Sequence, residues 1–262
     1  MVYCDKMTRF ITVASAKGGV GKSTFTVNLG AALHKYNRDV IVIDGNISTP
    51  NVSVLLGMPK LPITLHDVLA GKAKARQAIY VHPSGLKVLP AGLSMKNMKV
   101  KHKREIAHAL NELTGKTEFA LIDCAAGLGA EARQAMQAGD ELIIITNPEI
   151  HALTDALKAY EYSKTIGIKP LGVVLNRVNN KDWEMTKENV EEFLELPVIA
   201  MIPEDDNVKR AISLKKPLVY AYPNSPASRA IKKLAARMMG QDYRDLEPET
   251  FTERVLRAFG VY

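Results

Sequence analysis

Cysteine is scarce in this chain of 262 residues, which contains only Cys4 and Cys124. Two cysteines so far apart provide neither a disulfide framework nor metal-ligand spacing, and such low usage fits a reducing compartment. Long apolar runs are also missing, because no stretch reaches the ~20 apolar residues that a membrane-spanning helix needs. The first residues show no apolar leader pattern. We therefore expect a cytoplasmic protein that is soluble or at most attached to a membrane surface.

Aromatic residues make up only 6% of the chain and do not interleave with its basic runs, so a base-stacking surface is not indicated. Positive charge, by contrast, is in excess, with a formal net charge of +7. This excess favours polyanionic neighbours such as a nucleotide, nucleic acid or anionic lipid. The basic runs lie at 99–104, 209–210 and 215–216. Runs of this kind are more often solvated faces than binding sites.

Short β-branched runs alternate with helical patterns along the chain. The runs at 40–43 and 142–145 are apolar throughout, as expected for parallel strands covered on both faces. The alternation predicts a single-domain α/β fold, an open, mostly parallel, twisted sheet with helices on both faces and ligands at the carboxyl ends of the strands. We place this domain at 1–240 and a polar linker with a short terminal helix at 241–262. The expected strands are 10–15, 40–44, 86–90, 119–123, 141–146, 170–175 and 197–201, and the expected helices are 24–35, 103–113, 130–137, 153–166, 186–194 and 228–239.

A glycine-rich loop joins the first expected strand to the first helix and ends in Gly21-Lys22-Ser23. Gly18, Gly19 and Gly21 allow positive φ and bring successive N–H groups onto phosphate oxygens, and the helix N-terminus adds partial positive charge. Lys22 can then reach the β- and γ-phosphates, and the Ser23 hydroxyl can ligate Mg²⁺. A flexible linker is the simple alternative, but a linker rarely stands between a strand and a helix. The loop therefore predicts phosphate binding.

Two aspartates end buried strands beside this loop. Asp44 follows the apolar run 40–43, and Asp123 follows 119–122. An acid at the carboxyl end of a strand next to the first strand can hold Mg²⁺ through its coordinated waters. An ordinary helix-capping or turn aspartate is the alternative, and for Asp123 we favour the metal role.

The loop resembles the deviant Walker A motif of the MinD/ParA class of P-loop ATPases, which residues 17–24 match as KGGVGKST. The resemblance extends in order over about residues 10–240 and is closest to archaeal MinD-like proteins. It implies a P-loop NTPase fold of the SIMIBI type, with ATP and Mg²⁺ as cofactors. The other similar segments are 44–51, 65–71, 89–93, 146–149, 153–156, 175–178 and 202–205.

By this resemblance, Lys17 reaches the nucleotide of a second subunit, so that a homodimer encloses two ATP molecules. A cation that contacts the partner's phosphates makes pairing depend on the charge of the nucleotide, and ATP and ADP then give different dimer stabilities. By the same resemblance, Asn176 contacts the edge of the adenine base, and Pro203, Glu204 and Asp205 line the base and ribose. The resemblance assigns the phosphates to Gly18, Gly19, Val20, Gly21, Lys22, Ser23 and Thr24, catalysis to Lys17, Lys22, Asp44, Asn46 and Asp123, and the metal to Ser23, Asp44 and Asp123.

The chain departs from the family at Asn46. The resemblance implies that an aspartate at this position orients the attacking water. An asparagine oxygen can accept a hydrogen bond from water, but it carries no charge and cannot act as a base. Since phosphoryl transfer depends mainly on positioning and charge stabilisation, we expect hydrolysis to be slowed rather than abolished.

The last twelve residues, 251–262, have a helical pattern with Phe251, Val255 and Phe259 on one face and Arg254 and Arg257 on the other. Such a helix can lie in the interface of an anionic membrane, as the similar terminal helix of MinD proteins does. Packing back onto the protein is the alternative. A helix this short anchors weakly, so doubling it by dimerisation would matter through avidity.

Several functions remain open. The first is a MinD-like ATPase that positions cell-division or other envelope machinery, acting in the cytoplasm or at the inner face of the cell membrane. The second is a ParA-like partition protein that binds DNA non-specifically, which the net charge favours, and the third is a nucleotide-gated scaffold with little turnover. Iron–sulfur relatives use paired cysteines from each subunit, which Cys4 and Cys124 do not supply. The sequence names no regulator or cargo, and it leaves Trp183 as either a partner contact or a cap over the sheet edge.

Overall fold

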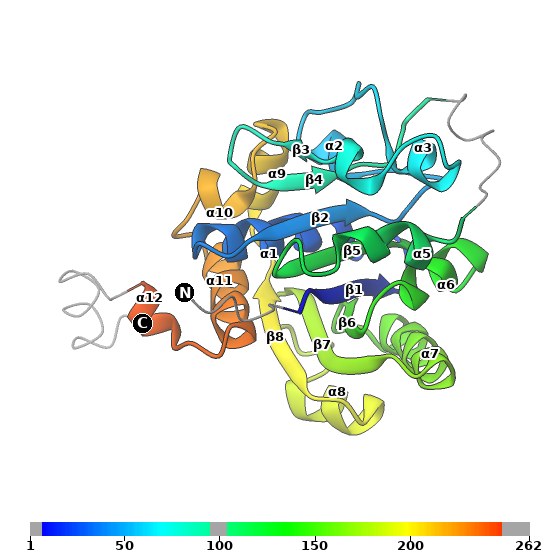
Figure 1. Cartoon of the computed structure of the whole chain (residues 1–262). Coiled ribbons are helices and arrows are strands. Elements are labelled where there is room, and N and C mark those ends of the chain that lie inside the picture. Colours follow the sequence, from blue (N-terminus) through cyan, green and yellow to red (C-terminus); the bar gives the residue numbers. More distant parts are fainter. Residues whose placement is uncertain (1–6, 95–103, 248–262) are drawn as a thin grey trace.

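A single eight-stranded sheet forms the centre of the computed structural model, which describes residues 7–94 and 104–247 (Figure 1). The strand order is β3-β4-β2-β5-β1-β6-β7-β8, and every neighbouring pair is parallel except β3 and β4. The predicted open, mostly parallel sheet is therefore confirmed. The strands are β1 (Arg9–Ser15), β2 (Val40–Asp44), β3 (Tyr80–Val81), β4 (Lys87–Leu89), β5 (Phe119–Ala126), β6 (Glu141–Thr146), β7 (Lys169–Val178) and β8 (Val198–Pro203).

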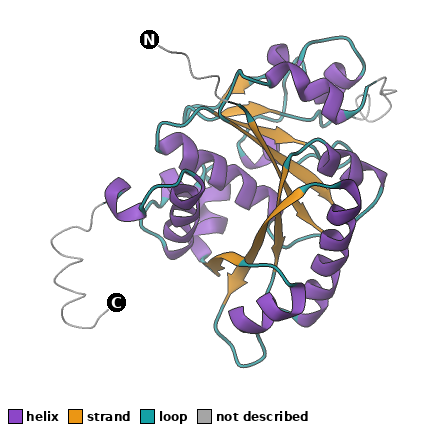
Figure 2. Ribbon diagram, turned by 60° about the horizontal axis from the view of Figure 1, so that its bottom comes forward, coloured by secondary structure: helices purple, strands orange, loops and turns teal. Residues whose placement is uncertain are grey.

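Helices cover both faces of this sheet and enclose a hydrophobic core on each (Figure 2). The helices of one face are α1 (Lys22–Lys35), α2 (Val52–Leu55), α9 (Asp206–Ser213), α10 (Leu218–Ala221) and α11 (Pro226–Met238). The helices of the other face are α3 (Leu65–Leu69), α5 (Ile106–Leu110), α6 (Ala130–Gln137), α7 (Ile150–Ile166) and α8 (Lys187–Leu194). Two 3₁₀ turns, η1 (Ala75–Ala78) and η2 (Asn111–Leu113), and the short α12 (Tyr243–Leu246) complete the described chain.

Strand β1 explains why the central strands are apolar throughout. Its Ile11 and Val13 enter the core under α1, whereas Phe10 and Ala14 enter the core on the opposite face. Helix α1 also approaches the sheet closely, because a Cβ atom on Gly30 would lie 2.5 Å from Val42 Cγ2. Glycine at this position lets the helix that follows the loop pack tightly on β2, which fixes the loop above the strand ends.

Some short elements were not among the predictions. The helix expected at 103–113 is confined to α5, and a 3₁₀ turn, η2, follows it. The helix expected at 24–35 begins two residues earlier, at Lys22, and strand β7 continues to Val178. Strand β3 and helices α2, α3, α10 and α12 have five residues or fewer, too few to establish a hydrophobic period.

The beginning of the predicted linker is fixed to the domain by ionic contacts. Glu247 accepts hydrogen bonds from Lys232 on α11 and from Lys35 at the end of α1. The hydroxyls of Tyr36 and Tyr243 donate to the same carboxylate over 3.3 and 3.2 Å. The Lys232 side chain is buried, so Glu247 supplies the counter-charge for an ammonium group largely removed from water. The predicted terminal helix, 251–262, lies outside the described residues.

Candidate nucleotide-binding site

The glycine-rich loop occupies the position predicted for it, between β1 and α1 at the carboxyl edge of the sheet. Gly19 and Gly21 have φ of 81° and 93°, the left-handed region that favours glycine. A Cβ atom on Gly21 would lie 2.4 Å from the Asn176 amide nitrogen, so a side chain there would be strained and would clash. Val20 is buried, whereas Gly18 and Gly19 are exposed. The loop therefore presents its glycine backbone outward at the start of α1.

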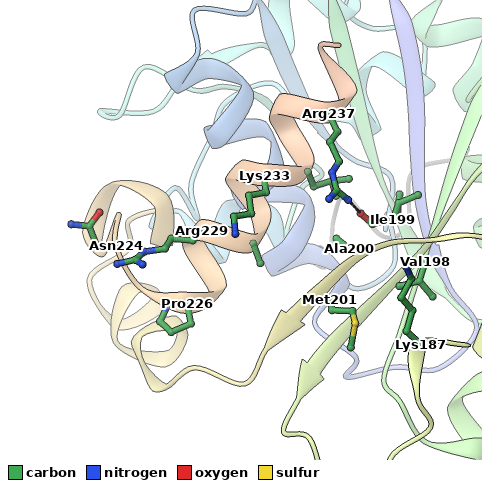
Figure 3. A pocket seen from close by; sticks show the side chains of 12 residues that line it. Lys187, Val198, Ile199, Ala200, Met201, Asn224, Pro226, Arg229, Lys233 and Arg237 are labelled. Carbon is green, nitrogen blue, oxygen red and sulfur yellow. Dashed lines mark hydrogen bonds between the residues drawn. The ribbon is translucent and has the colours of Figure 1, made fainter. Parts of the chain in front are cut away.

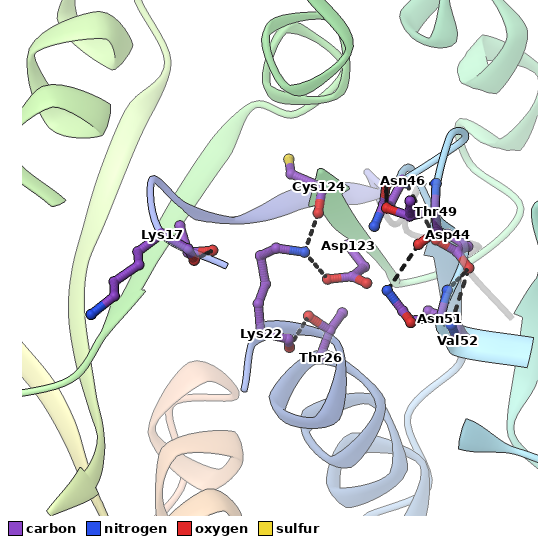
Figure 4. Close-up of polar contacts among 11 residues, drawn as sticks. Lys17, Lys22, Thr26, Asp44, Asn46, Thr49, Asn51, Val52, Asp123 and Cys124 are labelled. Atoms are coloured by element: carbon purple, nitrogen blue, oxygen red, sulfur yellow. Dashed lines mark hydrogen bonds and ion pairs between the residues drawn. The ribbon is translucent and has the colours of Figure 1, made fainter. Parts of the chain in front are cut away.

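Lys22 points inward from the first turn of α1, toward the ends of the central strands (Figure 4). Its ammonium lies 2.7 Å from Asp123 Oδ1 and also donates to the Cys124 carbonyl. The side chain is buried, so this ion pair is screened little by water. Ser23 and Thr24 follow in the same turn and are half-buried. A phosphate bound by the loop would offer Lys22 a second anionic partner.

Asp44 and Asp123 are direct neighbours in the sheet, and both are buried. Asp44 ends β2, whereas β5 continues three residues beyond Asp123, to Ala126, and so is longer than the predicted strand 119–123. Burial, followed by the charge of Asp123, raises the pKa of Asp44 to about 8, although the Val52 N–H and Lys22 lower it. Asp123 Oδ2 is buried and has no hydrogen-bond partner within 7–94 and 104–247. Two adjacent carboxylates with one lysine, and one carboxylate oxygen without a donor, fit a divalent cation held by oxygen ligands.

The segment after β2 is held in place by side-chain contacts in its middle and at its end. Asp44 Oδ2 accepts from the N–H groups of Asn51 and Val52, both at 3.0 Å. Ser48 donates from its N–H and its hydroxyl to the Glu131 carboxylate on α6, at 2.7 and 2.5 Å. This contact of Glu131 depends on the tertiary fold, and the sequence carried no signal for it.

Asn46 lies in this fixed segment and is buried. Its side-chain oxygen accepts from the Thr49 hydroxyl at 2.9 Å and from the Thr49 N–H at 3.3 Å. Its own N–H donates to Asp44 Oδ1 at 3.3 Å. The oxygen that would orient a water molecule therefore already accepts two local hydrogen bonds (Figure 4).

The four residues predicted to contact the base and ribose line one cavity together with Gly21 and Thr24. Asn176 donates from its amide nitrogen to the Val20 carbonyl at 2.7 Å, which joins β7 to the loop. The other three are Pro203, Glu204 and Asp205.

The two acids at the end of β8 differ in their surroundings. Glu204 is exposed and lies 3.7 Å from Arg177, a contact that the sequence did not suggest. Asp205 caps α9 through the Asn207 N–H at 2.9 Å and also accepts from the Ala227 N–H at 3.2 Å. Burial opposes ionisation of Asp205, but hydrogen bonds from Asn207, Ser225 and Ala227 outweigh it and hold the pKa below its ordinary value. Asp205 thus has a structural role beside the cavity.

Lys17 extends away from Lys22, out of the loop (Figure 4). Its side chain is 46% exposed, and its ammonium lies 3.8 Å from the Glu149 carboxylate. The two lysines of the loop therefore face different surroundings, one the buried acids and the other the protein surface. Trp183 is also on the surface. Because 75% of it is exposed, it does not pack over the edge of the sheet as a cap would.

A glycine-rich loop between a strand and a helix, an inward lysine at the helix start and two strand-end aspartates together define a P-loop nucleotide-binding protein. The ParA family model, described as NUBPL iron-transfer P-loop NTPase, matches residues 6–239. The chain belongs to the ParA/MinD family of P-loop NTPases.

Three similar proteins illustrate this membership. An uncharacterized ATP-binding protein of Methanocaldococcus jannaschii is 40% identical, over 89% of this chain and 88% of its own length. The septum site-determining protein MinD of Pyrococcus horikoshii, solved with Mg-ADP, is 38% identical with a TM-score of 0.85, over 88% of this chain and 96% of that one. MinD of the Aquifex aeolicus MinC:MinD cell-division complex is 27% identical with a TM-score of 0.78, over 89% and 96%.

Within the described residues, we find no helix with the length and apolar character needed to cross a membrane.

Proposed function

We propose that this protein is an ATP-dependent switch that forms a homodimer when it holds ATP and that positions cell-division or other envelope machinery. Membership of the family makes it a P-loop ATPase with ATP and Mg²⁺ as cofactors. One observation carries the proposal beyond that class. The loop holds one lysine against buried acids and presents a second, Lys17, at the surface, where it can reach another molecule.

The residues of this chain divide the chemistry among them. The loop N–H groups and Lys22 bind the phosphates, and Asn176 with the β8 end holds the base. Ser23, Asp44 and Asp123 would hold Mg²⁺, which neutralises charge on the phosphates when bound. The buried strand ends exclude water from this edge. Asn46 stands where the attacking water would be positioned, but it carries no charge and its oxygen already accepts two hydrogen bonds from Thr49.

Replacing Lys17 by alanine is expected to abolish ATP-induced dimers while the affinity of the monomer for ATP changes less than about threefold. The reason is that Lys17 contacts neither Lys22 nor its acids, so its loss removes the charge offered to a second subunit and the 3.8 Å surface contact with Glu149 but leaves the phosphate site in place. Sedimentation velocity with ATP, ADP and no nucleotide measures the effect. Lys158→Ala, an exposed lysine on α7, is the control. ATP-induced pairing that survives in Lys17→Ala, or that is absent from the natural protein at saturating ATP, would contradict the proposal.

Replacing Asn46 by aspartate is expected to raise the rate of ATP hydrolysis by at least about tenfold, because a carboxylate can orient water and accept its proton. Single-turnover measurement of phosphate release checks this. Asn51→Asp is the matched control, since Asn51 is an exposed amide in the same segment. An Asn46→Asp protein no faster than the natural one would show that Asn46 does not limit turnover, and the low-turnover scaffold would then lose its main support.

A second candidate function is ParA-like binding of DNA, which the net charge of +7 favours. Binding of DNA that requires ATP and weakens steeply with salt would distinguish it from attachment to anionic membranes through 251–262. The similarity to the septum site-determining protein MinD of Pyrococcus horikoshii and to MinD of the Aquifex aeolicus cell-division complex favours the positioning role.

A further inference from the structure

A groove of about 750 Å³ runs between strand β8 and helix α11, away from the nucleotide site (Figure 3). Its floor is mostly apolar and includes Ile199 and Met201 of β8 and Leu234 of α11. No residue that lines this groove also lines the base cavity at the end of the same strand. The groove is thus a separate feature of the surface.

The strand along the groove is the last in the sheet. Over the described chain, β8 pairs with β7 on one side and with no strand on the other. The Ile199 carbonyl of this strand accepts a hydrogen bond from Arg237 of α11 at 3.2 Å, so this backbone group faces the groove. Met201 is 38% exposed. An open strand edge beside an apolar floor is suited to receive an extended segment.

The charge of the groove identifies what kind of segment fits. Lys187, Arg229, Lys233 and Arg237 line it, and no aspartate or glutamate is among the described residues that do so. Two of these cations, Lys187 and Lys233, have weak contacts. Lys187 is 3.8 Å from Glu191, and Lys233 is 5.8 Å from the centroid of the Tyr243 ring. Carboxylates placed in the groove would therefore gain charge-assisted hydrogen bonds.

We propose that this groove binds an acidic segment of a partner protein, which adds to β8 as a further strand. Side chains alternate along a strand, so acidic residues at every second position can face the basic residues of α11, while the apolar residues between them point to the opposite face, beside the apolar side chains of β8. The apolar floor and the strand edge favour a peptide over a nucleic acid, whose phosphates would use only the cations. The proposal does not depend on ATP or on dimerisation.

The test uses the full chain and a fluorescent peptide of about ten residues that alternates glutamate and valine, long enough to span β8. Fluorescence anisotropy should show saturable binding. The double variant Lys233→Glu, Arg237→Glu should weaken it at least about tenfold, because two attractive contacts become repulsive. Lys158→Glu, Lys164→Glu on α7 makes the same change in net charge and should alter the affinity less than about twofold. ATP hydrolysis should be unchanged in both variants, which confirms that they fold.

Two further peptides test the strand geometry. N-methylation at every glutamate, or instead at every valine, removes the N–H groups of one edge only. One of these peptides should bind like the parent and the other should not, since a single edge pairs with β8. Equal binding of both would overturn strand addition. Failure of the parent peptide to bind would overturn the proposal, as would a DNA duplex that binds instead and is released by Lys233→Glu, Arg237→Glu.

Discussion

Replacement of Lys22 by methionine is expected to lower the affinity for ATP at least about 100-fold, or about 2.8 kcal/mol. The ammonium is buried at the start of α1, where charge-assisted hydrogen bonds to phosphate are strong. Methionine keeps the apolar stem but removes the charge. Titration calorimetry with ATP measures the loss. The same substitution at Lys35, at the opposite end of α1, should leave ATP affinity unchanged.

The Lys22 variant also leaves Asp123 without its counter-charge beside Asp44. A lower unfolding temperature is therefore a separate expected effect. The double variant Lys22→Met, Asp123→Asn removes both charges and should recover stability without recovering ATP binding. Tight ATP binding by a folded Lys22→Met protein would show that the phosphates lie elsewhere, and it would remove the assignment of the site.

Replacement of Glu247 by alanine is expected to lower the free energy of unfolding by about 3 kcal/mol, because it leaves the buried Lys232 ammonium unpaired. Burial already lowers the pKa of Lys232, which shows that its charged form is costly in this position. Urea unfolding followed by circular dichroism measures the change. Asp245→Ala, an exposed carboxylate of the same segment, should cost less than about 0.5 kcal/mol.

A compensating pair separates lost charge balance from lost contact. Lys232→Met, Glu247→Gln should be more stable than Glu247→Ala, since neither buried charge remains. Lowering the pH should also reduce the stability of the natural protein. Burial would raise the pKa of Glu247, but hydrogen bonds from Lys232 and Lys35 outweigh it and hold the pKa low. The contribution of ionised Glu247 to the free energy of unfolding is therefore fully present above the ordinary glutamate pKa of about 4.3. It is lost as the pH falls through the lower pKa that Glu247 has in the folded protein. A natural level of stability in Glu247→Ala would contradict this account.

The central strands and the loop could be predicted from the sequence because their signals are local. The apolar run 40–43 and the glycines at 18, 19 and 21 each express a backbone requirement in consecutive residues. The order of the strands was not predicted, because β1 pairs with β5 and β6, which lie far along the chain. Helix α9 was missed although Asp205 caps it, since we had assigned that carboxylate to the ribose.

The candidate site residues could be named from the sequence and from its resemblance to a family, but their contacts could not. Nothing in the residues around Ser48 indicates that Glu131 binds it, and nothing near Lys17 singles out Glu149. Such contacts arise where segments from different βα units meet at one edge of the sheet. The Lys22–Asp123 pair likewise joins residues about a hundred positions apart.

The carboxyl group of Asp44 has two roles. It accepts hydrogen bonds from the N–H groups at the start of α2, and it lies beside Asp123 at the proposed metal site. Truncating it would free that helix start at the same time as it removed a carboxyl group from the proposed metal site. An inactive alanine variant at this position would thus confound a folding defect with a chemical one. Asparagine, whose oxygen can still cap the helix, is the substitution that isolates the charge.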